Sequence, residues 1–195
     1  QEKLINNFEE ETINCIKRKF SSNPILHAFQ IVVNNYKIPI ELIKSFLNSM
    51  KMDIYQEKHS EDSYNNYIYG SAEVIGLMCI HIFCKGNKDK IEELKYPAQK
   101  LGAAFQKVNF LRDLKDDYEN KGRLYFPELN KNGVLDNELK ILIQNQIEND
   151  FDEGLKGIKK LPNNSRFGVY LAYRYFRVLF NKLKNTDANE IMEKR

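Results

Sequence analysis

Residues 106–117 read QKVNFLRDLKDD and place amides and acids at helical spacing. At about 100° per residue, Gln106, Asn109, Asp113 and Asp117 fall within a stripe roughly 80° wide on one face of a helix. The opposite face of the same segment is apolar. The pattern therefore predicts a helix that packs on one side and carries polar chemistry on the other.

The two acids of this stripe have two interpretations. A solvated face with charges at i,i+4 spacing is the common outcome for an isolated pair. Here the amides lengthen the stripe, and Arg112 and Arg123 bring guanidinium groups near the acids without an i,i+4 pair. Oxygen ligands suit Mg²⁺, which in proteins combines few carboxylates with phosphate oxygens. We therefore expect a Mg²⁺ site and a diphosphate substrate.

Length and composition favour one globular domain. The chain has 195 residues, of which 42% are hydrophobic and 29% charged, and its formal net charge is +3. This amount of apolar sequence supports a core of ordinary size. A charge balance this close to neutral argues against nucleic acid as the main partner.

The cysteines and the apolar runs bear on the compartment. Cys15, Cys79 and Cys84 form no CxxC pair, and the last two lie in an apolar run, which predicts buried thiols in a reducing setting. The longest apolar run, Val74–Cys84, is far shorter than the ~20 residues of a spanning helix. We expect a cytoplasmic protein with, at most, peripheral contact with the inner face of a membrane.

Helical periodicity accounts for most of the chain. Breakers containing Pro, Gly, Asn or Ser separate seven segments, and alternating strand patterns bounded by turns are absent. The expected helices span 2–20, 25–36, 40–55, 63–83, 96–119, 137–155 and 166–184. The sequence therefore predicts a single all-α domain with helices packed around a central cavity.

A second stripe runs along the fourth expected helix. Tyr67, Ser71, Val74, Ile75 and Met78 share one face, while small residues keep the other sides thin. Ordinary helix packing with small residues at the crossings is one explanation. The other is an apolar wall for a hydrocarbon chain, with a phenol at its mouth that donates to phosphate or faces a carbocation.

The histidines and one further acid carry weaker signals. His27, His59 and His81 are scattered and form no nucleophile arrangement, so we interpret them as structural. Asp53 has two interpretations, a local cap or pair, or an acid that holds a basic residue near the site.

Several blocks together resemble the squalene and phytoene synthase family. They are YIYGSAEVIG (67–76), LGAAFQKVNFLRD (101–113) with Asp117, and GRLYFP (122–127). MKMD (50–53) is also similar to a family segment. The resemblance extends from about residue 24 to the end, and among members the chain looks closest to bacterial phytoene synthases.

The resemblance implies an all-α isoprenoid synthase fold and a set of site residues. By position, Tyr67, Asp113 and Asp117 would be catalytic, and Asn109, Asp113 and Asp117 would bind the metal. The residues that would contact substrate are Ser71, Ile75, Gln106, Arg112, Arg123, Tyr125, Tyr175 and Arg195. The implied cofactor is Mg²⁺, with Mn²⁺ as an alternative and no NADPH.

The resemblance also implies the reaction and the partners. Family members join two prenyl diphosphates head to head, here with geranylgeranyl diphosphate giving phytoene through prephytoene diphosphate in carotenoid biosynthesis. The alternatives are a squalene or dehydrosqualene synthase that uses farnesyl diphosphate, and a non-catalytic synthase-like assembly protein. Partners would be the prenyl diphosphate, a membrane surface and a carotenoid-pathway desaturase, with no nucleic acid.

One departure from the family pattern concerns its first aspartate motif. That motif belongs before Gln1, and Glu9–Glu11 lacks its context and reads as a solvated helix face. The family tail also continues past Arg195. We therefore expect residues 1–195 to be one domain truncated at the N-terminus and the C-terminus, inactive alone, within an active parent protein.

Overall fold

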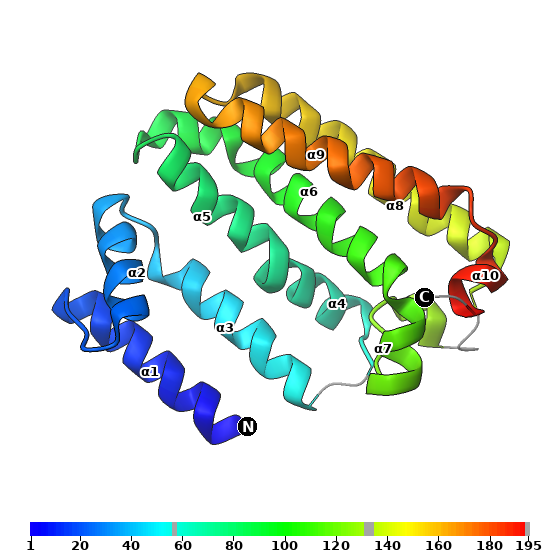
Figure 1. Cartoon of the computed structure of the whole chain (residues 1–195), viewed down its shortest axis with the longest axis horizontal. Coiled ribbons are helices and arrows are strands. Elements are labelled where there is room, and N and C mark those ends of the chain that lie inside the picture. Colours follow the sequence, from blue (N-terminus) through cyan, green and yellow to red (C-terminus); the bar gives the residue numbers. More distant parts are fainter. Residues whose placement is uncertain (56–57, 131–134, 194–195) are drawn as a thin grey trace.

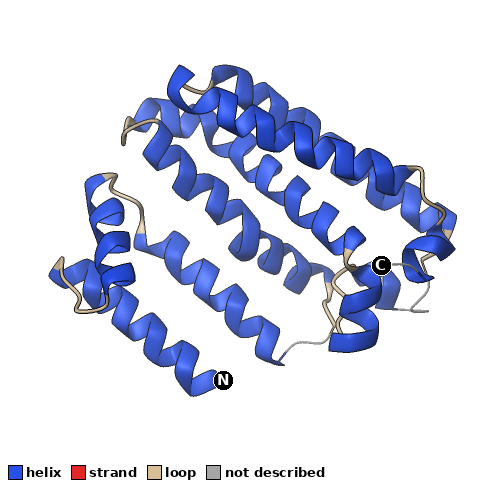
Figure 2. Cartoon of the chain, viewed as in Figure 1, coloured by secondary structure: helices blue, strands red, loops and turns tan. Residues whose placement is uncertain are grey.

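The computed structural model describes residues 1–55, 58–130 and 135–193. Within these ranges the regular structure is helical, apart from an isolated bridge between Lys58 and Leu124 (Figure 2). The helices are α1 (Glu2–Arg18), α2 (Pro24–Asn35), α3 (Ile40–Tyr55), α4 (Glu61–Ile68), the π-helical turn η1 (Tyr69–Glu73), α5 (Val74–Phe83), α6 (Lys88–Arg112), α7 (Leu114–Lys121), the 3₁₀ turn η2 (Pro127–Asn130), α8 (Asn137–Lys160), α9 (Asn163–Lys184) and α10 (Ala188–Glu193). The all-α prediction is confirmed.

The long helices lie side by side around α6 (Figure 1). From one edge of the molecule, α1, α3, α5 and α6 follow one another, and α8 and α9 pack together along the other side of α6. Helix α6 contacts η1, α5, α7, α8 and α9. Its residues can therefore reach both the core and any space between these helices.

Some helices are longer than their periodicity predicts, and for α6 a capping residue sets the earlier start. Helix α6 begins at Lys88 rather than near residue 96, since the Asn87 side chain accepts a hydrogen bond from the Lys90 amide at 3.0 Å. Helix α8 is capped by Asp136 and continues to Lys160, beyond the expected end at residue 155. Helix α10 was not expected.

Two expected helices are interrupted. The fourth contains the π-helical turn η1, which adds a residue to one turn and so rotates everything beyond it around the helix axis. The fifth ends at Arg112; Asp113 (φ −97°, ψ 8°) separates α6 from α7. Both interruptions lie inside the stripes from which the site was predicted.

Small residues bring α6 close to α5 and η1. A Cβ on Gly76 would lie 2.5 Å from the Ala98 carbonyl oxygen, and one on Gly102 would lie 2.5 Å from that of Ala72. These crossings match the packing interpretation of the small residues.

Among the described helices, none combines the length and the apolarity needed to cross a bilayer.

Candidate functional site

A cavity of about 810 Å³ lies between η1, α5, α6, α8 and α9. Four predicted substrate or metal residues line it: Ser71 from η1, Ile75 from α5, and Gln106 and Asn109 from α6. The amides stand one turn apart on the same helix face. The structure therefore brings together the part of the polar stripe that lies within α6.

The rest of the cavity wall is largely apolar. Leu101 and Phe105 of α6 face Val169 and Phe176 of α9, and the Phe105 and Phe176 rings stack with centroids 4.0 Å apart. Cys79, expected to be buried, is half-buried in this wall, and burial raises the pKa of its thiol. The α9 residues were not predicted, because their position depends on how α9 folds back over α6.

The Ser71 hydroxyl is a polar exception in this wall. Its Oγ is buried and has no hydrogen-bond partner among the described residues. Buried polar atoms are nearly always paired in native proteins, so this hydroxyl is an exception, and because the oxygen itself is buried, other atoms of Ser71 line the cavity.

The two acids of the stripe lie beyond the cavity lining and are paired with cations. Arg112 Nε donates to Asp113 Oδ1 at 2.8 Å, and Lys121 Nζ lies 2.9 Å from Asp117 Oδ1 and 3.0 Å from Asp116 Oδ2. Hydrogen bonds from these cations to the acids raise the pKa of both Arg112 and Lys121.

The expectation from the sequence takes only the two arginines as nearby cations, with no i,i+4 pair, whereas the structure pairs both acids with cations. Arg112 neutralises its sequence neighbour, and Lys121 stands at i,i+4 from Asp117, a spacing visible in the sequence. Tyr175 is exposed on α9 and belongs to the electrostatic surroundings of Arg112. Arg195 lies outside the described residues.

Three other predicted residues meet around Asp53 instead of the cavity. Tyr67 Oη donates to Asp53 Oδ2 at 3.0 Å, and Tyr125 Oη donates to Asp53 Oδ1 at 3.2 Å. The Arg123 guanidinium donates to the Asp53 backbone carbonyl and lies 3.8 Å from its carboxylate. Of the two interpretations of Asp53, the structure therefore favours the acid that holds a basic residue.

The placement of Tyr67 differs from the expected cavity mouth. Tyr67 lies one helical turn before Ser71, where its phenol meets Asp53, and it is not among the residues that line the cavity. Burial, followed by the Asp53 charge, raises the pKa of Tyr67. Its phenol is therefore neutral and fixed as a hydrogen-bond donor.

Aromatic rings close this cluster. His59 is buried, stacks on Tyr125 with centroids 5.4 Å apart and meets the Tyr67 ring edge-on at 5.2 Å. Phe110 of α6 stacks on the other side of Tyr125 at 4.0 Å. Burial lowers the pKa of His59. The cluster thus links α3, α4 and α6 to the loop after α7, with His59 packed among its rings.

The oxygen atoms near the two acids are of the types that bind a hard cation. Asp113, Asp117 and Asn109 offer carboxylate and amide oxygens, the ligand types that Mg²⁺ takes. Among residues 1–55, 58–130 and 135–193, no three His, Cys, Asp or Glu side chains form a group that could hold a metal. The residues present can supply part of a coordination shell, with phosphate oxygens as further ligands.

Comparison with known proteins assigns the family. The family model described as squalene/phytoene synthase matches residues 1–195. The chain belongs to this family. Phytoene synthase 1, chloroplastic, of Solanum lycopersicum is 28% identical over 184 residues, which cover 86% of this chain and 44% of that protein. The 4,4'-diapophytoene synthase of Staphylococcus haemolyticus is 25% identical over 183 residues, covering 86% and 63% respectively.

Solved structures show the same architecture. The squalene synthase HpnC from Alicyclobacillus acidocaldarius matches with a TM-score of 0.78 and 17% identity, over 92% of this chain and 72% of that chain. A dehydrosqualene synthase in complex with ligand gives 0.74 and 22%, over 89% and 65%. The fold is therefore the all-α isoprenoid synthase fold, as expected. The chain spans less than half the length of the plant relatives.

Proposed function

We propose that the protein containing this chain condenses two prenyl diphosphates head to head, with geranylgeranyl diphosphate as substrate and phytoene as product. One observation carries the proposal: the apolar cavity continues into the polar stripe. Gln106 and Asn109 line the cavity, and Asp113 follows Asn109 by one helical turn. Hydrocarbon and diphosphate thus each have a matching surface at adjacent positions.

The acid segment has the chemistry needed at the diphosphate end. In this proposal Asp113, Asp117 and Asn109 hold Mg²⁺, which when bound acts as a Lewis acid on the diphosphate leaving group. Once the carboxylates bind the cation, Arg112 and Lys121 become available to pair with phosphate oxygens. The existing ion pairs therefore keep the acids neutralised and the cations in place before substrate arrives.

The cavity wall has two tasks in the same proposal. Its apolar side chains exclude water, so an allylic cation formed there escapes quenching. The stacked Phe105 and Phe176 present aromatic rings, whose faces attract cations. Because the product forms by proton loss, no NADPH is required.

The test uses the full-length protein with Mg²⁺ and either geranylgeranyl or farnesyl diphosphate, without NADPH. The hydrocarbon is identified by chromatography and mass. We expect phytoene from the longer substrate, and none with EDTA. A C30 product from the shorter substrate would assign a dehydrosqualene synthase, and no turnover by folded protein would favour a non-catalytic assembly protein.

A further inference from the structure

Helix α9 has a second face that the cavity does not use. Its 22 residues, about 33 Å of helix, contain five cationic residues and no acid. One side packs on the core and lines the cavity through Val169, Ala172 and Phe176. The side that points away from the core is the subject of this inference.

Large apolar side chains form a stripe on that outer side. Phe167, Leu171 and Val178 are 76%, 60% and 64% exposed. At 100° per residue they fall within about 40° of one another, so they form one row along the helix, with Arg174 at its edge between Leu171 and Val178. Scattered exposed apolar residues are normal, but an aligned row on one helix marks a contact surface.

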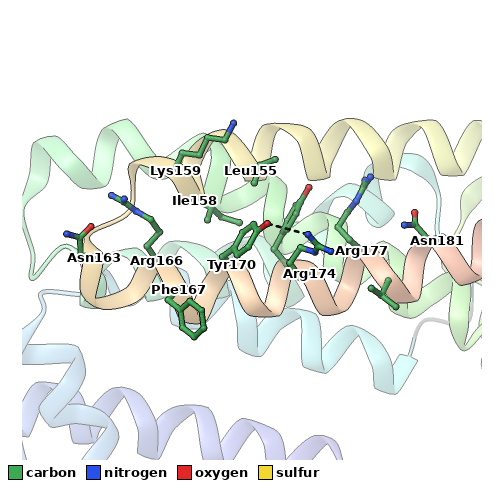
Figure 3. A pocket seen from close by; sticks show the side chains of 12 residues that line it. Leu155, Ile158, Lys159, Asn163, Arg166, Phe167, Tyr170, Arg174, Arg177 and Asn181 are labelled. Atoms are coloured by element: carbon green, nitrogen blue, oxygen red, sulfur yellow. Dashed lines mark hydrogen bonds between the residues drawn. The ribbon is translucent and has the colours of Figure 1, made fainter.

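A cationic groove of about 780 Å³ runs beside this row, between α8 and α9. Four basic residues line it, namely Lys159, Arg166, Arg174 and Arg177, and its lining contains no carboxylate. Figure 3 shows Arg174 and Arg177 on one side of α9, with Phe167 projecting on the other. Phe167 and Val178 of the row also line the groove, so cationic and apolar side chains meet on the exposed side of α9.

Few of these cations are neutralised. Arg177 pairs with Glu148 of α8 at 2.6 Å, and Arg166 donates to the Leu161 carbonyl at the end of α8. Arg174 contacts only the Tyr170 hydroxyl, at 3.5 Å, and Lys159 has no carboxylate partner among the described residues. Three positive charges thus remain unpaired in one groove, which favours an anionic occupant.

We propose that the outer face of α9 docks on the surface of a bilayer containing anionic phospholipid. Lipid phosphates bind along the groove, and Phe167, Leu171 and Val178 enter the boundary between headgroups and acyl chains. A cationic row beside an apolar row is the arrangement of helices that lie in the plane of a membrane interface. The cavity lies on the other side of the same helix, so docking places it next to the bilayer.

The experiment is co-sedimentation of the protein with phosphatidylcholine vesicles, with or without one third phosphatidylglycerol. We expect binding to the anionic vesicles that weakens in high salt. Lys159→Gln with Arg174→Gln should weaken it about 25-fold, at about fivefold per cation. Neither Lys159 nor Arg174 hydrogen-bonds to the backbone in the described part of the chain, so we expect the double variant to fold. Circular dichroism checks this. The matched control, Lys17→Gln with Lys44→Gln, removes the same charge from α1 and α3 and should have no effect.

A second variant tests the apolar row. Phe167→Ser with Leu171→Ser should reduce the binding that survives high salt. Equal binding to neutral vesicles, no binding to either, or equal loss in the control variant would overturn the proposal. So would a change in the protein's own oligomeric state without lipid, which would assign the face to a second copy. Vesicle binding does not depend on the proposed function, so each can fail alone.

Discussion

Two polar regions lie close to α7, and they differ in the groups that pair with their acidic side chains. Asp53 is enclosed by two buried phenols and the Arg123 guanidinium, beneath stacked aromatic rings. Asp113 and Asp117 pair instead with side chains that are themselves 43% and 46% exposed. The side chains of Asp53 and Asp113 are equally exposed, at 26%, so the difference lies in their partners. The first region is a network closed by buried neutral donors, and the exposed cations of the second can exchange partners.

This difference separates a scaffold from a binding region. Leaving a buried donor without its acceptor costs about 1–3 kcal/mol, so the Asp53 network resists rearrangement. An exposed ion pair contributes only about 0–1 kcal/mol, so a metal or phosphate can displace it. We therefore expect Asp53 to act on stability and Asp113 on activity.

The largest effect is expected for Asp113→Asn in the full-length protein. Loss of one ligand for the diphosphate charge should lower turnover about 100- to 1,000-fold, while the melting temperature changes little because the ion pair is exposed. Hydrocarbon formation and a thermal melt measure the two effects. Asp116→Asn is the control, since Asp116 shares the Lys121 contact but is not one of the predicted metal ligands. Equal losses in both variants would contradict the assignment.

Asp53→Ala should lower stability strongly, in contrast to Asp113→Asn. The Tyr67 and Tyr125 phenols lose their acceptor, whereas Arg123 keeps the Asp53 backbone carbonyl and loses only the carboxylate 3.8 Å away, so the free energy of unfolding should fall by about 2–4 kcal/mol. Urea denaturation measures this loss. Asp53→Asn keeps the shape and one acceptor oxygen and should lose less. An unchanged unfolding midpoint for Asp53→Ala would mean that the cluster does not hold α3 to the loop after α7.

Two glycine variants compare a closely packed position with an open position in the cavity walls. Gly102→Ala places a Cβ 2.5 Å from the Ala72 carbonyl oxygen, so α6 and η1 must separate, at about 1–3 kcal/mol. Gly168 also lines the cavity, but no atom lies within 4 Å of its added Cβ. Gly168→Ala should therefore stabilise α9 by up to about 1 kcal/mol. Chemical denaturation measures both changes in the free energy of unfolding. Equal effects would contradict close packing of α6 against η1 at Gly102.

The sequence predicted correctly which residues share a face where one uninterrupted helix carries the pattern. Gln106 and Asn109 share a face because α6 is regular between them, and Ser71 and Ile75 reach the same cavity. Tyr67 meets Asp53 instead of lining the cavity, because the cavity does not extend along the helix as far as Tyr67. Periodicity therefore predicts which residues share a face, but not how far along the helix a cavity extends.

Other parts of the site depend on tertiary structure. Phe176 enters the cavity only because α9 folds back over α6, and no local pattern reports that approach. Asp53 meets Tyr125 across 72 residues of chain. Lys121 is different, since its i,i+4 spacing from Asp117 was present in the sequence and predicts the observed pair.

The smallest expected effect is a pH dependence that belongs to the closed network alone. Burial lowers the pKa of His59, whose ordinary value is 6.5, so the unfolded chain binds a proton that the folded protein resists. Stability should therefore be constant above pH 6.5 and fall as the pH drops through 6.5, by at most about 1.4 kcal/mol per pH unit. His59→Gln should flatten this slope in denaturation measured between about pH 5.5 and 7.5. Ser63→Ala, which removes a hydroxyl 3.4 Å from His59 Nδ1 but leaves the ring, should keep the slope. Identical slopes in the His59→Gln variant and the unmodified protein would place the acid sensitivity outside this network.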